Sequence, residues 1–317
     1  MNKYIYICSA GFSGSTLLDL LLGSHSEIES LGEISQLPKN IALNTQCTCG
    51  ESVRSCRLWK DVLNSLENTI CENLLENPYA FNLGFIDATV IVDRNHQTRI
   101  YNSIGRVLRG ISYLDLAFGN GIFEAFMKDD TLKNNFLLYD TVIKHQGVHC
   151  VVDSSKDYLK GINLYRARPG QVKIIILTRN GKGVLYSNLK RGHNLKKSLM
   201  GWRNYYTHLF RLIEKYVPKS DYFTVKYEEL AKHPEDVLRS ICKYVGLAFE
   251  DTMLNFKKHL HHITNGNNMR FRNESSIIQL DEKWKSCLGE EEYRLFYQIC
   301  GSVNRELGYK GRIGVAS

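Results

Sequence analysis

The chain has 317 residues, of which 43% are hydrophobic and 23% are charged, the composition of an ordinary globular protein with a large core. Its net charge of +8 suits an anionic ligand, but basic residues are spread along the chain outside 182–197, which disfavours nucleic-acid binding. We find no apolar run long enough for a transmembrane helix and no separable signal peptide, so we expect a cytoplasmic protein with no membrane partner.

The N-terminal stretch predicts a strand, a turn of small residues and a helix. Residues 4–8 form an apolar, β-branched and aromatic run, residues 9–16 are mostly small, and leucines dominate 17–22. Such a turn is an anion site, because the first N–H groups of the helix have no intrahelical partner and carry partial positive charge. Close approach of a phosphate is favoured by Gly11 and Gly14, and hydroxyl donors are offered by Ser13, Ser15 and Thr16.

The spacing of this turn differs from a Walker A loop, which requires Gly-Lys-Ser/Thr after four residues. No lysine lies between Lys3 and Lys39. A plain turn that joins a core strand to a core helix is the alternative interpretation of this stretch alone.

Residues 40–147 predict a mostly helical insertion that packs over the phosphate loop and selects the acceptor. Helices are expected at 59–75 and 99–118, and a turn at 119–121. No linker composition separates this part, so we expect a single domain over residues 1–317.

Three cysteines, Cys47, Cys49 and Cys56, fall within ten residues. They can bind zinc if Cys71 or a histidine supplies a fourth ligand. A redox pair or ordinary buried thiols are equally compatible with the spacing.

The second half predicts further strands at 148–152, 172–178 and 222–226, alternating with helices at 158–168 and 234–245. Continuous apolar strands alternating with helices indicate an α/β fold with a central parallel sheet covered on both faces. Ligands bind beyond the carboxyl ends of such strands, where residues 13–16, 154–156 and Arg179 would meet. A closing amphipathic helix is expected at 284–309, with Gly308 as its stop.

Taken together, four segments resemble the sulfotransferases that use 3′-phosphoadenosine 5′-phosphosulfate (PAPS). Residues 11–18 resemble their 5′-phosphosulfate loop, and residues 174–187 resemble their 3′-phosphate site. Residues 225–230 are similar to their Tyr-Glu-Asp/Glu-Leu segment, and residues 262–271 to a Gly-Asn-x-x-Arg segment of bacterial members. The resemblance implies a P-loop-NTPase-like fold and PAPS as the co-substrate.

The resemblance also implies roles for individual residues. The 5′-phosphosulfate would be held by Gly11, Phe12, Ser13, Gly14, Ser15, Thr16 and Leu17, and the 3′-phosphate by Arg179 and Ser187, with Arg270 as a further anion contact. Glu33 resembles the general base of some members, and Lys156 the lysine placed against the transferring group. Phe12 departs from the pattern, because many members have Lys or Arg there.

These roles predict in-line transfer of a sulfuryl group to a hydroxyl or amine of a small-molecule or carbohydrate acceptor, with no metal required. If Glu33 is not the base, His25, His261 and His262 are the next candidates. One alternative is a P-loop kinase or NTPase in which Asp153 holds magnesium. The other is a non-catalytic nucleotide-binding protein on the same fold.

Overall fold

The computed structural model describes residues 2–84, 110–111, 113–114, 130–271 and 278–309. Its centre is a five-stranded parallel sheet with the strand order β2-β3-β1-β4-β5. The strands are β1 (Lys3–Ser9), β2 (Ile28–Gly32), β3 (Cys150–Lys156), β4 (Val172–Thr178) and β5 (Tyr222–Lys226). The predicted α/β class with a parallel sheet is therefore confirmed.

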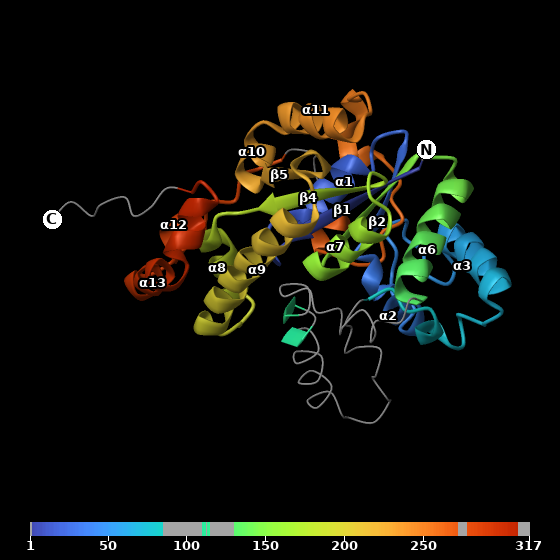
Figure 1. Ribbon diagram of the computed structural model, residues 1–317, viewed down its shortest axis with the longest axis horizontal. Coiled ribbons are helices and arrows are strands. Elements are labelled where there is room, and N and C mark those ends of the chain that lie inside the picture. The colour runs from blue at the N-terminus through green and yellow to red at the C-terminus, as the bar shows by residue number, and fades with distance from the viewer. Residues whose placement is uncertain (1, 85–109, 112, 115–129, 272–277, 310–317) are drawn as a thin grey trace.

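Helices cover both faces of the sheet (Figure 1). One face packs against α3 (Arg57–Ile70), α6 (Asp130–Gln146), α7 (Tyr158–Ala167) and α9 (Leu195–Tyr216), outside which α13 (Glu290–Glu306) lies. The other face packs against α1 (Ser15–Leu22) and α11 (Pro234–Val245).

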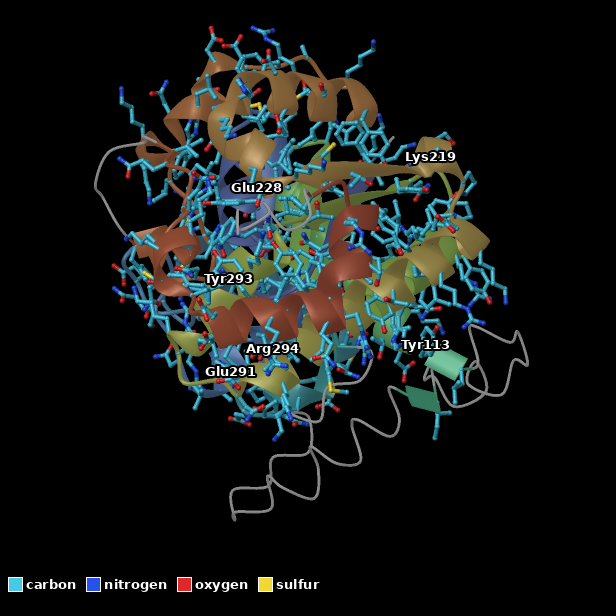
Figure 2. All side chains as sticks on the ribbon, turned by 90° about the vertical axis from the view of Figure 1, so that its left-hand side faces the viewer. Tyr113, Lys219, Glu228, Glu291, Tyr293 and Arg294 are labelled. Carbon is cyan, nitrogen blue, oxygen red and sulfur yellow. The ribbon has the colours of Figure 1, made fainter. Side chains whose placement is uncertain are left out.

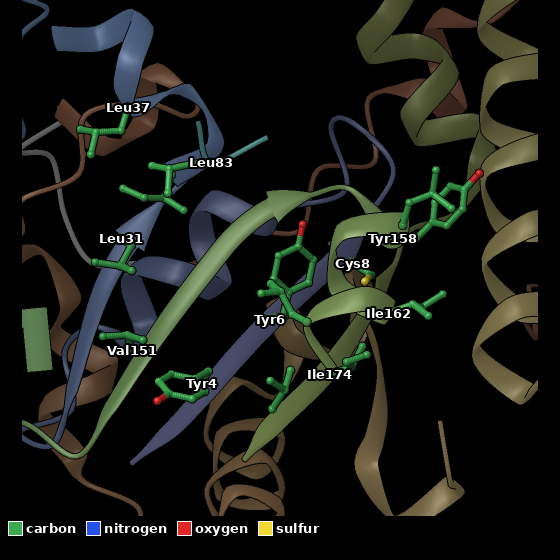
Figure 3. Packing of buried hydrophobic residues seen from close by; sticks show 14 of the residues in the cluster. Tyr4, Tyr6, Cys8, Leu31, Leu37, Leu83, Val151, Tyr158, Ile162 and Ile174 are labelled. Atoms are coloured by element: carbon green, nitrogen blue, oxygen red, sulfur yellow. The ribbon is translucent and has the colours of Figure 1, made fainter. Parts of the chain in front are cut away.

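The central strand β1 is buried on both sides, which explains its unbroken apolar sequence. Successive side chains of a strand point to opposite faces. Tyr4, Tyr6 and Cys8 accordingly belong to one core cluster, whereas Ile5 and Ile7 belong to the other. Figure 3 shows the first set packed beside α7. Full burial of each such large side chain contributes about 1.5–3 kcal/mol, so the two clusters fix the sheet between its helical layers.

The remaining described elements are short and lie mostly around the carboxyl edge of the sheet and the far ends of the helices. They are η1 (Ile34–Gln36), α2 (Leu37–Ala42), η2 (Pro78–Ala80), α8 (Gly181–Leu189), η4 (Lys219–Asp221), α10 (Tyr227–Lys232), η5 (Asp251–Lys258), η6 (Asn268–Phe271) and α12 (Trp284–Cys287). None of the helices in the described part of the chain has the length and apolar character needed to cross a lipid bilayer.

Most of the strands and helices predicted outside residues 40–147 are confirmed, with three differences. The strand expected at 148–152 begins at Cys150 and continues through the polar residues to Lys156, because these residues still pair with β1 and β2. Strand β2, which is only five residues long, was not predicted. The helix expected at 284–309 is two helices, because Leu288 and Gly289 are extended and α13 begins only at Glu290.

The described part of the predicted insertion at 40–147 is mostly helical, but residues 43–56 and 71–77 form turns and loops. Helix α3 ends at Ile70, earlier than expected, because Cys71 takes a left-handed conformation with φ 57°. Helix α6 packs against it. The helix expected at 99–118 and the turn at 119–121 lie almost entirely outside the described residues.

Candidate active site

The phosphate loop joins β1 to α1 and leaves the start of the helix open. The N-cap residue of α1 is Gly14, with φ 92°. Because it is a glycine, it has no side chain that could cap the helix. A Cβ atom at Gly11 would meet no atom within 4 Å. The N–H groups of the first helical turn lack intrahelical partners, so the loop fits an anion such as a phosphate or sulfate.

Two buried tyrosines hold the loop in this shape. The Tyr206 hydroxyl lies 3.4 Å from the Ser13 hydroxyl, accepts a hydrogen bond from the N–H of Ala10 at 3.4 Å, and donates to the Leu177 carbonyl of β4 at 2.9 Å. The ring of Tyr227 lies so close to Gly14 that a Cβ atom there would be 2.6 Å from it. Glycine at position 14 is therefore required both by its backbone conformation and by this contact.

Glu33 and Lys156 form an ion pair at the carboxyl ends of the neighbouring strands β2 and β3. Each side chain is 23% exposed, so the pair is partly shielded from water yet reachable. Lys156 has a left-handed backbone with φ 71°, and its carbonyl accepts a hydrogen bond from the Tyr205 hydroxyl at 2.5 Å. The two residues predicted to act on the transferring group thus lie in direct contact.

Arg179 follows β4 and links the phosphate loop to the C-terminal part of the chain. Its guanidinium donates to the Phe12 carbonyl at 2.9 Å and to the Asp281 carboxylate at 3.1 Å. The guanidinium also stacks on the ring of Tyr227 at 4.6 Å from the ring centre. A planar guanidinium held beside the loop can bind a phosphate through two hydrogen bonds once the Asp281 carboxylate has been displaced from it.

Gly183 lies beside Arg179, and Ser187 lies one turn further along α8. The Ser187 hydroxyl donates to the Gly183 carbonyl at 3.0 Å, and a Cβ atom at Gly183 would be 3.0 Å from Nε of Arg179. The helix itself starts from Asn180, whose N–H donates to Glu228 (Figure 2) at 2.9 Å. Arg179 thus directly precedes α8, whereas Ser187 lies in the last turn of the same helix.

Arg270 lies on a C-terminal segment that packs against the phosphate loop. It donates to the Gly266 carbonyl, while its Nε is buried and has no hydrogen-bond partner among the described residues. Burial lowers its pKa, and the carboxylate of Glu33 acts in the opposite direction. The neighbouring Asn267 donates its N–H to the Thr16 hydroxyl at 3.1 Å, which fastens this segment to the phosphate loop.

Phe12, the position at which the sequence departs from the pattern that it resembles, carries a cation on its ring. The Arg191 guanidinium lies 4.3 Å from the centre of the Phe12 ring, and His193 meets the ring edge-on. Stacking of this kind holds the positive charge next to the loop although position 12 is neutral.

A cavity of about 450 Å³ opens beside the phosphate loop and the lysine of the ion pair. Its wall includes Gly11, Lys156, Tyr205 and His208. Burial lowers the pKa of His208, whose ring stacks on that of Tyr113 (labelled in Figure 2) with 4.0 Å between ring centres. A second cavity of about 300 Å³ shares Gly11 and Tyr205 with the first, so the two open side by side against the loop.

Asp153 cannot serve as the magnesium ligand that a P-loop kinase would need. Its carboxylate is fully buried, pairs with Lys160 at 2.9 Å and accepts a hydrogen bond from the Tyr139 hydroxyl at 2.5 Å. Its second oxygen accepts the Ser155 N–H at 2.8 Å. These contacts commit the carboxylate to the fold and weaken the kinase interpretation.

The sequence-based comparison decides the family. Residues 5–251 match the model of the sulfotransferase family. The chain belongs to this family. Membership implies a PAPS-dependent sulfotransferase, which is a transferase with an acceptor substrate. This assignment takes the place of the two alternative interpretations of the sequence, a P-loop kinase and a non-catalytic nucleotide-binding protein. No sequence among the curated proteins matches it.

Two solved structures agree with the fold of this sulfotransferase. The sulfotransferase domain of the olefin synthase of Synechococcus PCC 7002 is 18% identical, with a TM-score of 0.52 over 98% of this chain and 96% of that domain. The sulfotransferase domain from the curacin biosynthetic pathway is 17% identical, with a TM-score of 0.53 over 98% of this chain and 99% of that domain. At such identities the likeness concerns the fold.

Sequence reasoning missed the residues that position the site. Tyr206 and Asp281 belong to no segment that resembles the family, and only the fold brings them to the loop. Tyr227 was part of a recognised segment, so its position beside Gly14 gives that segment a physical reason. Two of the histidines considered as alternative bases bond to main-chain carbonyls, His25 to that of Ala248 at 2.7 Å and His261 to that of Phe256 at 2.9 Å.

Proposed function

We propose that this sulfotransferase moves the sulfuryl group of PAPS to a hydroxyl or amine of a small-molecule or carbohydrate acceptor by in-line displacement. One observation carries the proposal. The open phosphate loop, the Lys156–Glu33 pair and Arg179 meet at the carboxyl ends of the adjacent strands β3, β1 and β4.

In this proposal the loop and Arg179 divide the nucleotide between them. The N–H groups from Ser13 to Leu17 bind the 5′-phosphosulfate, for which the uncapped start of α1 is suited. Arg179 exchanges the Asp281 carboxylate for the 3′-phosphate, and Ser187 adds a hydroxyl donor. The unpartnered Nε of Arg270 supports its assignment as a further anion contact.

Glu33 and Lys156 carry the chemistry. Glu33 takes the proton of the attacking hydroxyl or amine while the new bond to sulfur forms, a role that contributes about 10²–10⁴-fold to a rate. Lys156 neutralises the oxygen that keeps the electron pair of the breaking sulfur–oxygen bond. Their mutual contact supports these roles, because it places a carboxylate and an ammonium group side by side at the ends of β2 and β3.

The acceptor occupies the 450 Å³ cavity in this proposal, because Lys156 lines its wall and Tyr205 joins that wall to the β3 end. A volume in this range is typical of small-molecule sites, about 300–1,000 Å³. The contact of Tyr113 with His208 supports an acceptor-selecting role for the helical insertion, within a single sulfotransferase domain.

A thermal-shift titration tests the nucleotide assignment. The full-length protein is titrated with 3′,5′-bisphosphoadenosine and, separately, with ATP and magnesium. A ligand that binds only the folded state raises the unfolding temperature, and 100-fold excess over Kd adds about 2.7 kcal/mol of stability. A shift with the bisphosphate alone is expected. A shift with ATP–magnesium alone would overturn the proposal.

The acceptor assignment has its own test. Candidate phenols, sugars and amines are incubated with the protein and PAPS, and release of the bisphosphate is measured. We expect turnover to depend on acceptor and to fall strongly in Tyr205→Ala, which alters the cavity wall. Turnover that ignores changes in this wall would contradict the placement of the acceptor.

A further inference from the structure

The three clustered cysteines acquire a fourth partner in the folded chain. Cys47, Cys49, Cys56 and His262, hereafter the Cys/His cluster, place one sulfur or nitrogen atom each within 4.8 Å of all the others. Of the two fourth ligands considered from sequence, the structure brings in a histidine. Cys71 is exposed at the end of α3 and lies outside the cluster.

The distances suit a tetrahedral metal ion. Zinc bound to thiolates at about 2.3 Å requires ligand atoms about 3.8 Å apart. The Sγ atom of Cys56 lies 3.2 Å from Nδ1 of His262, and the 4.8 Å limit covers every other pair. Two of the thiols, those of Cys47 and Cys56, are fully buried, so a bound ion would be largely shielded from water.

The backbone around the cluster is held in place independently of any metal. The loop between Cys47 and Cys49 is a tight turn in which the Gly50 N–H donates to the Cys47 carbonyl at 3.1 Å, with φ 97° at Gly50. The indole N–H of Trp59 donates to the His262 carbonyl at 2.7 Å. Between them, Thr48 donates its N–H to the Ile263 carbonyl at 3.0 Å. Two chain segments more than 200 residues apart thus present their ligands to one point.

We propose that the Cys/His cluster binds a structural zinc ion. Three thiolates and one imidazole form a closed four-ligand set that leaves no open position for catalysis. A disulfide would use only two of the three thiols and would give neither the third thiol nor the imidazole a reason to converge. Soft sulfur ligands also favour zinc over magnesium or calcium.

The ion would fasten the His262–Arg270 segment to the loop after α2. That segment continues to Asn267, which bonds to Thr16 of α1, and Thr264 accepts a hydrogen bond from Asn40 of α2 at 2.9 Å. A structural zinc contributes folding free energy directly, because the unfolded chain has no preformed site.

Metal content is the first test. Full-length protein purified without chelators or a metal-affinity tag is analysed by inductively coupled plasma mass spectrometry, and we expect one zinc ion per chain. Replacement by Co²⁺ should give the intense visible bands of tetrahedral cobalt and a thiolate-to-cobalt charge-transfer band. Chelation should lower the unfolding temperature, and added zinc should restore it.

Variants identify the ligands. Cys49→Ser and His262→Ala should lose the metal, His262→Cys should retain it as a four-cysteine site, and the matched control Cys71→Ser should behave like the wild type. If Cys49→Ser does not fold, the cobalt spectrum of the wild type still decides the matter. The proposal is overturned if the wild-type protein neither contains nor takes up a stoichiometric metal. It is equally overturned if mass spectrometry finds a disulfide within the cluster in the native protein.

Discussion

Replacing Asp281 by asparagine should tighten the binding of 3′,5′-bisphosphoadenosine. The Asp281 carboxylate holds the Arg179 guanidinium at 3.1 Å in the free protein. The 3′-phosphate must displace it in the proposed complex, so the ion pair is a cost of binding. Asp281→Asn removes the negative charge but keeps an oxygen acceptor and the main-chain contact of Asp281 with Arg179 at 3.2 Å.

The size of the effect follows from the exposure of the two side chains. Asp281 is 39% exposed and Arg179 only 7%, so the pair lies at the edge of the protein interior. Partly exposed pairs of this kind contribute about 0.2–1 kcal/mol. Since 1.36 kcal/mol corresponds to a factor of ten, Kd should fall about 1.5- to 5-fold. Arg179→Ala removes charge-assisted hydrogen bonds worth about 1.5–3 kcal/mol and should raise Kd about 13- to 160-fold.

Isothermal titration calorimetry measures both variants, and Asp61→Asn on the exposed side of α3 controls for the change in net charge. The double variant should bind like Arg179→Ala, because the benefit of Asp281→Asn requires the arginine. Weaker binding by Asp281→Asn would refute the reasoning, since it would mean that the carboxylate supports the nucleotide-binding arrangement. A benefit that persists without Arg179 would also refute it.

Three further predictions concern the base, the loop and a buried acid. Glu33→Gln should lower kcat about 10²–10⁴-fold while leaving Kd for the bisphosphate nearly unchanged, as separate turnover and calorimetric measurements would establish; full activity would exclude Glu33 as the base. Gly14→Ala should cost about 1–3 kcal/mol in urea unfolding, because its φ of 92° and the Tyr227 ring at 2.6 Å exclude a Cβ atom, whereas the control Gly11→Ala meets open space and should unfold like the wild type. Burial raises the pKa of Asp19 from 3.8 to about 8, so the unfolded chain releases this proton at lower pH than the folded one and stability falls as pH rises from about 4 to 8. Asp19→Asn can keep the hydrogen bond from Ser30, so its free energy of unfolding should rise relative to that of the wild type between pH 5 and pH 8. If the difference in unfolding free energy between variant and wild type is the same at both pH values, this origin is contradicted.

Much of the fold could be predicted because its strands are strongly apolar. The bounds predicted for the third strand, residues 172–178, are those of β4, because residues 174–177 form an unbroken apolar run in a central strand buried on both faces. Strand β2 could not be found in the same way. It is short, lies at the edge of the sheet and contains Glu29 and Ser30, so its sequence resembles a loop. The predicted strand also ended too early, at residue 152, because the polar residues that follow do not look like a strand. Asp153 nevertheless lies in β3, where its buried carboxylate pairs with Lys160.

The candidate site, too, could be predicted only in part. Local sequence could indicate the phosphate loop, because the strand, the glycines and the helix that form it are contiguous. It could also place Arg179 at the end of its strand. It could not indicate that Asp281 holds the arginine fork, or that Arg191 covers Phe12, because both contacts join residues that only the tertiary fold brings together.

The segment from His262 to Arg270 connects the two sites that the chain presents. At one end it supplies the fourth member of the Cys/His cluster, and at the other end Asn267 bonds to Thr16 at the start of α1. Gly266 lies between them with φ 126°, where a Cβ atom would be 3.2 Å from the Thr16 hydroxyl oxygen. The segment therefore has little freedom to shift at the loop while His262 is fixed. Fixing its far end with the proposed metal would reduce the conformational entropy that the phosphate loop loses on binding an anion, which is a physical reason for a structural ion in this enzyme.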